Sequence, residues 1–181
     1  MPVRRLNRPF TVVLTGVENA QKTTIGHLLA ERNGWPLIEE AARFDAAVIA
    51  GQVALKDLQR LQDQFMAAVD ERIRTSTAPV LLCDTGGLVL DIWAREVFGV
   101  GLQHTEEAMR LMDLHLLLHT MPEWHPDPLR TLPRHEDRIA LQERYRARLA
   151  SSGRPFAAIP MTSTDDRVKH AHDLILENSG R

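Results

Sequence analysis

The stretch FTVVLTGVENAQKT, residues 10–23, decides the fold of this chain. Its opening part is a short, largely apolar run rich in β-branched side chains, which is typical of a strand buried on both faces of a parallel sheet. A glycine and a polar loop follow it. From Lys22 the apolar residues recur at helical spacing until Asn33 and Gly34, where a helix is expected to end. The stretch therefore predicts a buried strand, a loop and a helix in direct succession.

Strand-like and helical patterns alternate along the rest of the chain. Further strands are predicted at residues 35–38, 79–84, 114–118 and 156–160. Helices are predicted between and after them, at residues 53–76, 88–98, 106–112, 135–149 and 165–176. This alternation predicts an α/β fold with a five-stranded parallel sheet and helices on both faces. No interior linker divides the chain, so residues 1–181 are expected to form one domain.

Composition and charge argue against several classes of protein. Hydrophobic residues make up 44% and charged residues 25% of the 181 residues, and the formal net charge is -2. This balance gives no sign of a nucleic-acid-binding or membrane-bound protein. The single cysteine, Cys83, excludes an internal disulfide framework and suits a reducing compartment. We therefore expect a cytoplasmic protein whose partner is a small molecule; a homodimer is compatible with the sequence but not indicated by it.

Residues 16–23, GVENAQKT, fit the pattern of a phosphate-binding loop between a strand and a helix. Backbone N–H groups of such a loop attract phosphate oxygens, the lysine neutralises the β- and γ-phosphates, and the next hydroxyl coordinates Mg²⁺. The pattern predicts a P-loop NTPase fold with ATP and Mg²⁺ as its ligands. The expected binding residues are Gly16, Glu18, Asn19, Ala20, Gln21, Lys22, Thr23 and Thr24.

Gln21 departs from the pattern G-x-x-x-x-G-K-[ST], which has a glycine at this position. Glycine there permits unusual backbone angles and a close approach of the phosphate. Gln21 must therefore adopt that geometry or shift the loop. A strand, turn and helix with a chance lysine is the alternative interpretation, and the surrounding pattern favours the phosphate loop.

Two acidic residues are expected near this loop, because the carboxyl ends of parallel strands meet at one edge of the sheet. Asp84 closes the third strand and is expected to hold Mg²⁺ with Thr23, while a helix-capping role is a compatible alternative. Glu40 follows the second strand and is placed to accept a hydrogen bond or a proton from a substrate hydroxyl. Arg43 would bind substrate or pair with Glu40, and a solvated ion pair fits the spacing equally well.

A lid is expected at about residues 121–150, where a loop with four prolines precedes a charged helix. Arginines on such a segment can close over the phosphates and offset charge in the transition state. Arg130 and Arg134 are the residues expected to do so, and Arg138 lies one helical turn after Arg134. The alternative is an ordinary charged helix face, because charged residues continue along the helix.

Four segments resemble, in order, the ribosylnicotinamide kinase domain of NadR-type proteins and the small AAA-like ATPases around it. Residues 16–23 are similar to that family's phosphate loop, which also has glutamate third. Residues 40–43 resemble its E-x-x-R element, and Asp84-Thr85 resembles its aspartate-threonine strand end. Trp124, Asp127 and Arg130 have the spacing of its W-x-x-D-x-x-R lid segment.

The resemblance implies a kinase that transfers the γ-phosphate of ATP to the 5′-hydroxyl of nicotinamide riboside, a step of NAD biosynthesis. The expected catalytic residues are Lys22, Glu40, Asp84, Arg130 and Arg134, and the expected substrate contacts are Glu40, Arg43, Asp84, Trp124 and Asp127. Two alternatives remain open. Gln21 would suit a nucleotide-binding regulatory module with little turnover. A nucleoside-monophosphate kinase would need a basic group for its acceptor phosphate, which Arg43 or Arg95 would supply.

Overall fold

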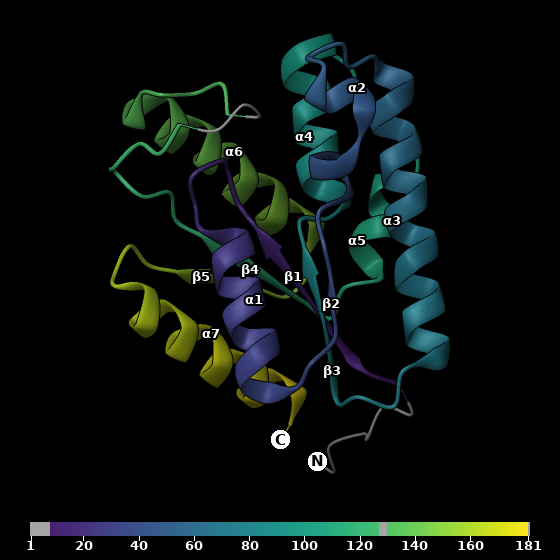
Figure 1. Cartoon of the computed structure of the whole chain (residues 1–181), viewed down its shortest axis with the longest axis vertical. Helices are drawn as coiled ribbons and strands as arrows, with labels where there is room; N and C mark the ends of the chain where they lie inside the picture. The colour runs from purple at the N-terminus through teal and green to yellow at the C-terminus, as the bar shows by residue number, and fades with distance from the viewer. Residues whose placement is uncertain (1–7, 127–129, 181) are drawn as a thin grey trace.

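The computed structural model describes residues 8–126 and 130–180, and within them five strands form one parallel sheet (Figure 1). The strands are β1 (Phe10–Thr15), β2 (Leu37–Ile38), β3 (Val80–Asp84), β4 (Leu114–Leu118) and β5 (Phe156–Ile159). Their order across the sheet is β2-β3-β1-β4-β5, so the first strand of the chain lies at its centre. This confirms the predicted five-stranded parallel sheet.

Helices cover both faces of the sheet, as the alternating pattern predicts. α1 (Lys22–Asn33) and α7 (Thr164–Ser179) lie on one face, in front of the sheet in Figure 1. The other face is covered by α3 (Leu55–Thr75), α4 (Gly87–Phe98), α5 (Thr105–Arg110) and α6 (His135–Ser152). After β2 come the 3-10 helix η1 (Ala41–Phe44) and the short α2 (Ala46–Ile49), which lies at the upper end of α3 and α4.

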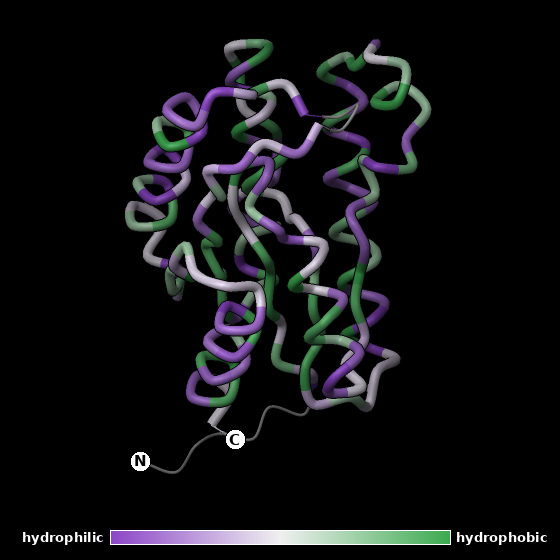
Figure 2. The backbone as a smooth tube through the Cα atoms, turned by 60° about the vertical axis from the view of Figure 1, so that its left-hand side comes forward, coloured by the Kyte–Doolittle hydropathy of each residue, from purple (hydrophilic) through white to green (hydrophobic). Residues whose placement is uncertain are grey.

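The side chains of β1 divide between two hydrophobic cores. Val12 and Leu14 pack with Ile25 of α1 and Ile175 of α7, whereas Val13 packs with Phe65 of α3 on the opposite face. Both faces of β1 are therefore buried, which explains why its sequence is a nearly continuous apolar run instead of an alternating one. Removing each such side chain from water contributes about 1.5–3 kcal/mol. In Figure 2 the strands inside the molecule are largely hydrophobic, and the helices outside alternate between hydrophobic and hydrophilic residues.

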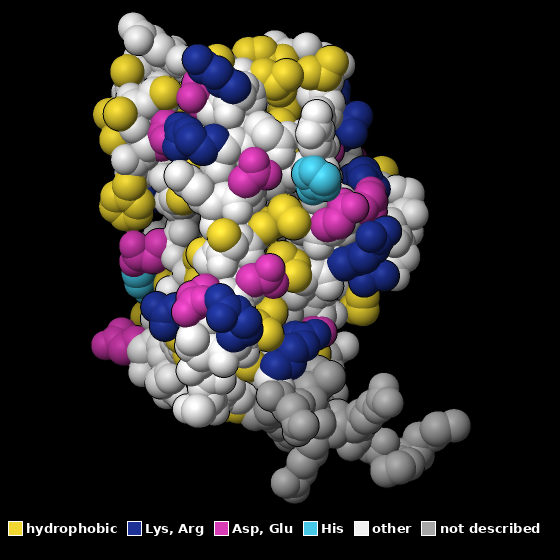
Figure 3. Space-filling model, turned by 90° about the vertical axis from the view of Figure 1, so that its right-hand side faces the viewer, with side chains coloured by type: hydrophobic (Ala, Val, Ile, Leu, Met, Phe, Trp, Pro, Cys, Tyr) yellow, Lys and Arg dark blue, Asp and Glu magenta, His cyan; other side chains and the backbone are white. Residues whose placement is uncertain are grey.

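The surface along α3 carries acidic and basic side chains side by side, with hydrophobic side chains at its upper end (Figure 3). Two exposed hydrophobic residues at that end of the molecule, Phe44 and Ile49, belong to η1 and α2. No helix in the described part of the chain is long and apolar enough to cross a lipid bilayer. All five strands point the same way, so the loops that follow them gather at one edge, where the candidate site lies.

Candidate active site

The loop after β1 begins with a glycine whose side-chain position is filled by another strand. Gly16 has φ +146°, and a Cβ atom built on it would lie 2.6 Å from the carbonyl oxygen of Leu118 at the end of β4. Any larger residue would push the loop away from the sheet. The first residue of the GVENAQKT pattern is therefore fixed by backbone packing.

Gln21, which replaces the second glycine of the usual pattern, adopts the backbone geometry of a glycine. Its φ of 62° and ψ of 23° lie in the left-handed region, where a non-glycine residue is strained. Gln21 therefore has a backbone conformation that glycine adopts without strain. Its amide oxygen accepts a hydrogen bond from Arg167 on α7, at 3.0 Å.

The N-terminus of α1 is open to an anion. Its N-cap residue makes no side-chain capping bond, and its first turn contains no acidic residue. The N–H groups of this turn therefore have no side-chain partner within the described part of the chain, and they carry the positive end of the helix dipole. Lys22 adds a cation, and its Nζ donates to the carbonyl oxygens of Gly16 (2.9 Å) and Val17 (3.0 Å). Phosphate oxygens bind at such helix ends.

Thr23 and Asp84 meet beside the loop, as their positions in the sequence predict. The Thr23 hydroxyl donates to Oδ2 of Asp84 at 2.6 Å. Oδ1 of Asp84 is buried and has no hydrogen-bond partner among the described residues. A hydroxyl and an unpartnered carboxylate oxygen are hard oxygen donors, the kind that Mg²⁺ prefers. The two residues therefore fit a magnesium ion held jointly with nucleotide phosphates, which supply further ligands.

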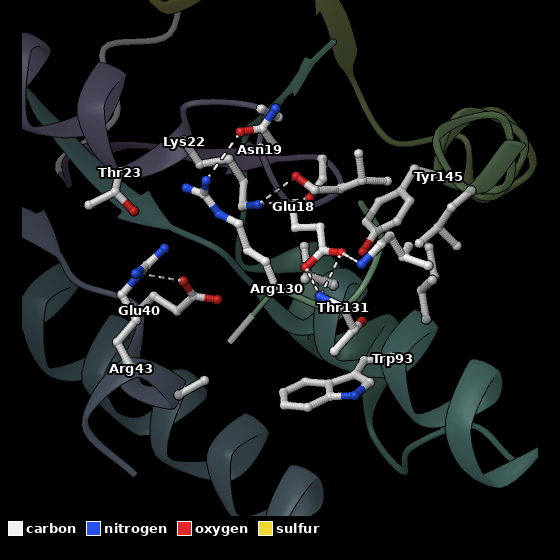
Figure 4. Close-up of a pocket in the computed structure, with 18 of the residues that line it drawn as sticks. Glu18, Asn19, Lys22, Thr23, Glu40, Arg43, Trp93, Arg130, Thr131 and Tyr145 are labelled. Atoms are coloured by element: carbon white, nitrogen blue, oxygen red, sulfur yellow. Dashed lines mark hydrogen bonds and ion pairs between the residues drawn. The ribbon is translucent and has the colours of Figure 1, made fainter. Parts of the chain in front are cut away.

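A cavity of about 480 Å³ joins the phosphate loop to residues from five other segments (Figure 4). Its walls come from residues 16–24, from η1 and α2, from α4, from residues 130–132 and from α6. This volume is typical of a small-molecule site. The phosphate loop occupies one side, and the remaining space can hold a second molecule next to the phosphates.

Glu40 points into this cavity and pairs with Arg43, as one reading of their spacing predicts. Nε of Arg43 lies 3.1 Å from Oε2 of Glu40, and both side chains line the cavity. In Figure 4 the Glu40 carboxylate faces the space between Thr23, Lys22 and Arg130. The ion pair therefore holds the Glu40 carboxylate close to the phosphate loop, where a hydroxyl of a bound molecule could donate to it.

The wall opposite the loop is apolar and aromatic. α4 contributes Val89, Ile92 and Trp93, and α6 contributes Leu141 and Tyr145. Burial raises the pKa of the Tyr145 hydroxyl, and the nearby carboxylates raise it further, so it stays a neutral donor. Sequence reasoning missed Tyr145. The signal for it was the four-residue spacing of Leu141 and Tyr145, which places both on one helix face.

Two side chains of the phosphate loop hold the predicted lid. The Glu18 carboxylate accepts hydrogen bonds from the backbone N–H groups of Thr131 and Leu132, at 2.8 Å in the case of Thr131. Oδ1 of Asn19 accepts from Nη1 of Arg130 at 3.1 Å, and its Nδ2 donates to the carbonyl oxygen of Met121. Arg130 therefore lines the cavity beside the loop, where the sequence places it. The role of Glu18 as an anchor for this segment was not anticipated.

Two residues expected in the site lie elsewhere. Arg134 is exposed at the N-cap of α6, 3.8 Å from Glu136 and Asp137, and does not line the cavity. Arg138, one turn later, is instead fully buried and binds backbone carbonyl groups of the loop. Trp124 does not line the cavity either. Its ring packs against the Arg138 guanidinium, whose Cζ lies 5.1 Å from the ring centre. The side chains of an irregular proline-rich loop have no regular periodicity, which is why spacing misplaced them.

Three further expectations from the sequence concern Arg95, Asp127 and a metal ion. Arg95 does not line the cavity, because its Nε pairs with the buried carboxylate of Asp91 at 2.8 Å. Asp127 lies outside the described residues. Among the described residues, no group of three or more His, Cys, Asp or Glu side chains is arranged to hold a metal ion. A metal at Thr23 and Asp84 would therefore depend on ligands from a nucleotide.

A family model described as an AAA domain matches residues 11–167. Among solved structures, NadR protein in complex with NAD and AMP-PNP is similar with a TM-score of 0.70 at 21% identity, over 96% of this chain and 50% of that one. NadR protein in complex with NR is similar with a TM-score of 0.64 at 22% identity, over 96% and 52%. Deoxyadenosine kinase from M. mycoides, with dCMP and dCDP, is similar with a TM-score of 0.64 at 12% identity, over 92% of this chain and 98% of that one.

These similarities establish a P-loop kinase-like α/β fold. This chain spans about half the length of the NadR chains. A comparison with curated protein sequences finds no match.

Proposed function

The chain belongs to the AAA domain family, and on that basis we propose that it is an ATP-dependent phosphotransferase acting on a nucleoside-like small molecule. One observation carries the proposal. The phosphate loop, the Glu40 carboxylate and the Trp93 ring face the same cavity of about 480 Å³ (Figure 4). A module that only bound a nucleotide would not need a carboxylate and an aromatic wall beside the terminal phosphate.

The acceptor that we propose is nicotinamide riboside, converted to its mononucleotide. The four segments that resemble ribosylnicotinamide kinase domains support it, and one of the similar NadR structures holds NR. The apolar faces of Trp93 and Tyr145 suit a flat base ring. Glu96, on the same side of α4, lines the cavity and, although it pairs with Arg144, brings a carboxylate near the place proposed for the cationic pyridinium of this nucleoside.

Each residue of the site has a role in the transfer. Lys22 and the N–H groups of the loop bind the β- and γ-phosphates and offset their charge. Thr23 and Asp84 would hold Mg²⁺, which would offset the negative charge of the phosphates. Glu40 orients the acceptor hydroxyl and takes its proton as the oxygen bonds to the γ-phosphorus. The bond from that phosphorus to the β–γ bridging oxygen breaks, and ADP leaves.

Positioning and charge stabilisation supply most of the rate in such a reaction, because phosphoryl transfer requires little covalent help from the protein. Arg43 holds the Glu40 carboxylate at the wall of the cavity. Arg130 lines the same cavity and donates to Asn19 of the loop. From there its guanidinium can offset charge on the transferred group.

The proposal is tested by ADP release from Mg-ATP with a panel of nucleosides led by nicotinamide riboside. Release that depends on the acceptor would support the phosphotransferase and identify its substrate. Tight ATP binding without turnover on any acceptor would point instead to a nucleotide-binding regulatory module. If a nucleoside monophosphate were the best acceptor, the reaction class would stand and the proposed acceptor would be wrong.

A further inference from the structure

The side chain of Arg167, in the first turn of α7, is fully buried against the phosphate loop. Its Nη2 donates to the carbonyl oxygens of Ala20 (3.2 Å) and His119 (2.8 Å), and its Nη1 donates to Oε1 of Gln21 (3.0 Å). One guanidinium therefore joins the phosphate loop, the residue after β4 and the start of α7.

The amide nitrogen of Gln21 makes a second bond between the phosphate loop and α7. Its Nε2 donates to the Thr164 hydroxyl at 3.3 Å, so α7 holds both polar atoms of the side chain. The backbone of Gln21 meanwhile occupies the left-handed region, which costs a non-glycine residue about 1–2 kcal/mol. The hydrogen bonds from α7 oppose that strain, because a relaxed backbone would carry the amide away from Arg167 and Thr164.

The charge of Arg167 has no counter-ion in the described part of the protein. The guanidinium contacts carbonyl, amide and thioether groups, and its Nε is buried without a partner. Burial lowers its pKa to about 10, so the group stays protonated at neutral pH. A buried charge of this kind is costly unless an opposite charge lies near it. Phosphates bound in the adjacent loop would supply that charge.

We propose that Gln21 and Arg167 form a positioning pair that replaces the loop glycine and adds positive charge behind the nucleotide phosphates. The inference rests on the proposed function, since it assumes that the loop binds a nucleotide. Arg167 holds Gln21 in its left-handed conformation and holds Ala20 by its carbonyl group. The N–H groups that follow are thereby aimed at the phosphates. Gln21 is then a working substitute for glycine and not a defect in the loop.

The test is a double-mutant cycle on Mg-ATP affinity, measured by calorimetry on the full chain. Gln21→Ala keeps the backbone strain and removes both side-chain bonds, so it is expected to raise the Kd for ATP roughly tenfold. Arg167→Met is expected to raise it at least as much. The double variant should lose clearly less affinity than the sum of the two single losses, because the two residues share the contact between them. The KM for the acceptor should not change in Gln21→Ala.

Arg32→Ala is the matched control. It removes the exposed ion pair of Arg32 with Asp165 (2.8 Å), which joins the same two helices away from the loop, and should leave ATP affinity unchanged. Gln21 is only partly buried, so Gln21→Ala tests the pair even if Arg167→Met fails to fold. The positioning pair would be wrong if Gln21→Ala bound ATP with wild-type affinity, or if Gln21→Gly bound it more tightly than the wild type. Either result would leave the proposed function standing. A wild-type protein that binds no ATP overturns the proposed function.

Discussion

The two carboxylate oxygens of Asp84 have different surroundings. One accepts a hydrogen bond from Thr23, and the other is buried with no partner among the described residues. Leaving such an oxygen unsatisfied costs about 1–3 kcal/mol. That is a large share of the total stability of a domain, which is about 5–15 kcal/mol. At the scale of a single residue, this unpartnered oxygen supports the proposal that Asp84 holds a cation.

Replacing Asp84 by asparagine is therefore expected to lower kcat roughly 100-fold, because the metal loses its charged ligand. The measurement is acceptor-dependent ADP release over a titration of Mg²⁺. Thr23→Val should show the same loss, and Thr23→Ser, which keeps the hydroxyl, should retain activity. Unchanged activity of Asp84→Asn at saturating Mg²⁺ would show that this carboxylate does not hold the metal.

At the scale of an element, α4 presents one face to the cavity. Val89, Ile92, Trp93, Glu96 and Val97 all line it, at the spacing that keeps side chains on one side of a helix. These residues lie opposite the phosphate loop and not in it. The helix should therefore determine which acceptor binds, without affecting the nucleotide.

Trp93→Ala tests this division of roles. Loss of a stacking surface worth about 1–3 kcal/mol is expected to raise the KM for the acceptor roughly tenfold or more. The Kd for ATP should stay unchanged, and Trp93→Phe should show an intermediate KM. Steady-state kinetics with each substrate varied in turn give both values. An unchanged acceptor KM in Trp93→Ala would mean that the base binds elsewhere.

The contact between Glu18 and the segment at residues 130–132 makes a second prediction at this scale. The amide protons of Thr131 and Leu132 are bonded to the Glu18 carboxylate, and bonds to charged groups contribute about 1.5–3 kcal/mol. Glu18→Ala is expected to speed hydrogen exchange at these two amides roughly 10-fold to 100-fold. The amide of Thr120, which donates to Gln142, serves as an internal reference whose exchange should not change. Equal exchange in both proteins would rule out Glu18 as the anchor.

The parts of the site that the sequence predicted follow from regular structure. Lys22, Thr23 and Asp84 lie at the ends of strands and the start of a helix, so parallel pairing is enough to bring them together. The parts that it did not predict depend on contacts between distant segments. Gln21 and Arg167 are 146 positions apart, and no periodicity relates a loop residue to a helix that far away. Arg138 likewise binds carbonyl groups at residues 121–122 and 132–133, and no local pattern indicates its burial.

At the scale of the whole molecule, one buried histidine should make the free energy of unfolding depend on pH. His115 lies in β4, 2% exposed, and burial lowers its pKa to about 4. The unfolded chain takes up a proton at about pH 6.5, while the folded chain does not until about pH 4. Between these values the unfolded state binds more protons, so the stability contributed by His115 is lost as the pH falls.

Chemical denaturation of the wild type and of His115→Leu at several pH values checks this. From about pH 6.5 down to about pH 4, the free energy of unfolding of the wild type should fall more steeply than that of the variant, by up to about 1.4 kcal/mol per pH unit. Near pH 8 neither state titrates at this residue, so the difference measured there isolates the effect of packing. If the free energy of unfolding fell equally with pH in both proteins over the whole range, His115 would not be the source of the pH dependence.

The position of β1 in the middle of the sheet has a consequence for synthesis of the protein on the ribosome. β1 and the phosphate loop emerge early, but both strands that flank β1, and the helix that holds Gln21, are encoded later. Chains are made at about 5–20 residues per second, and domains tend to fold as units. Nascent chains arrested before residue 164 should therefore carry the whole GVENAQKT loop and still fail to retain ATP. Nucleotide binding would then report that translation has passed α7.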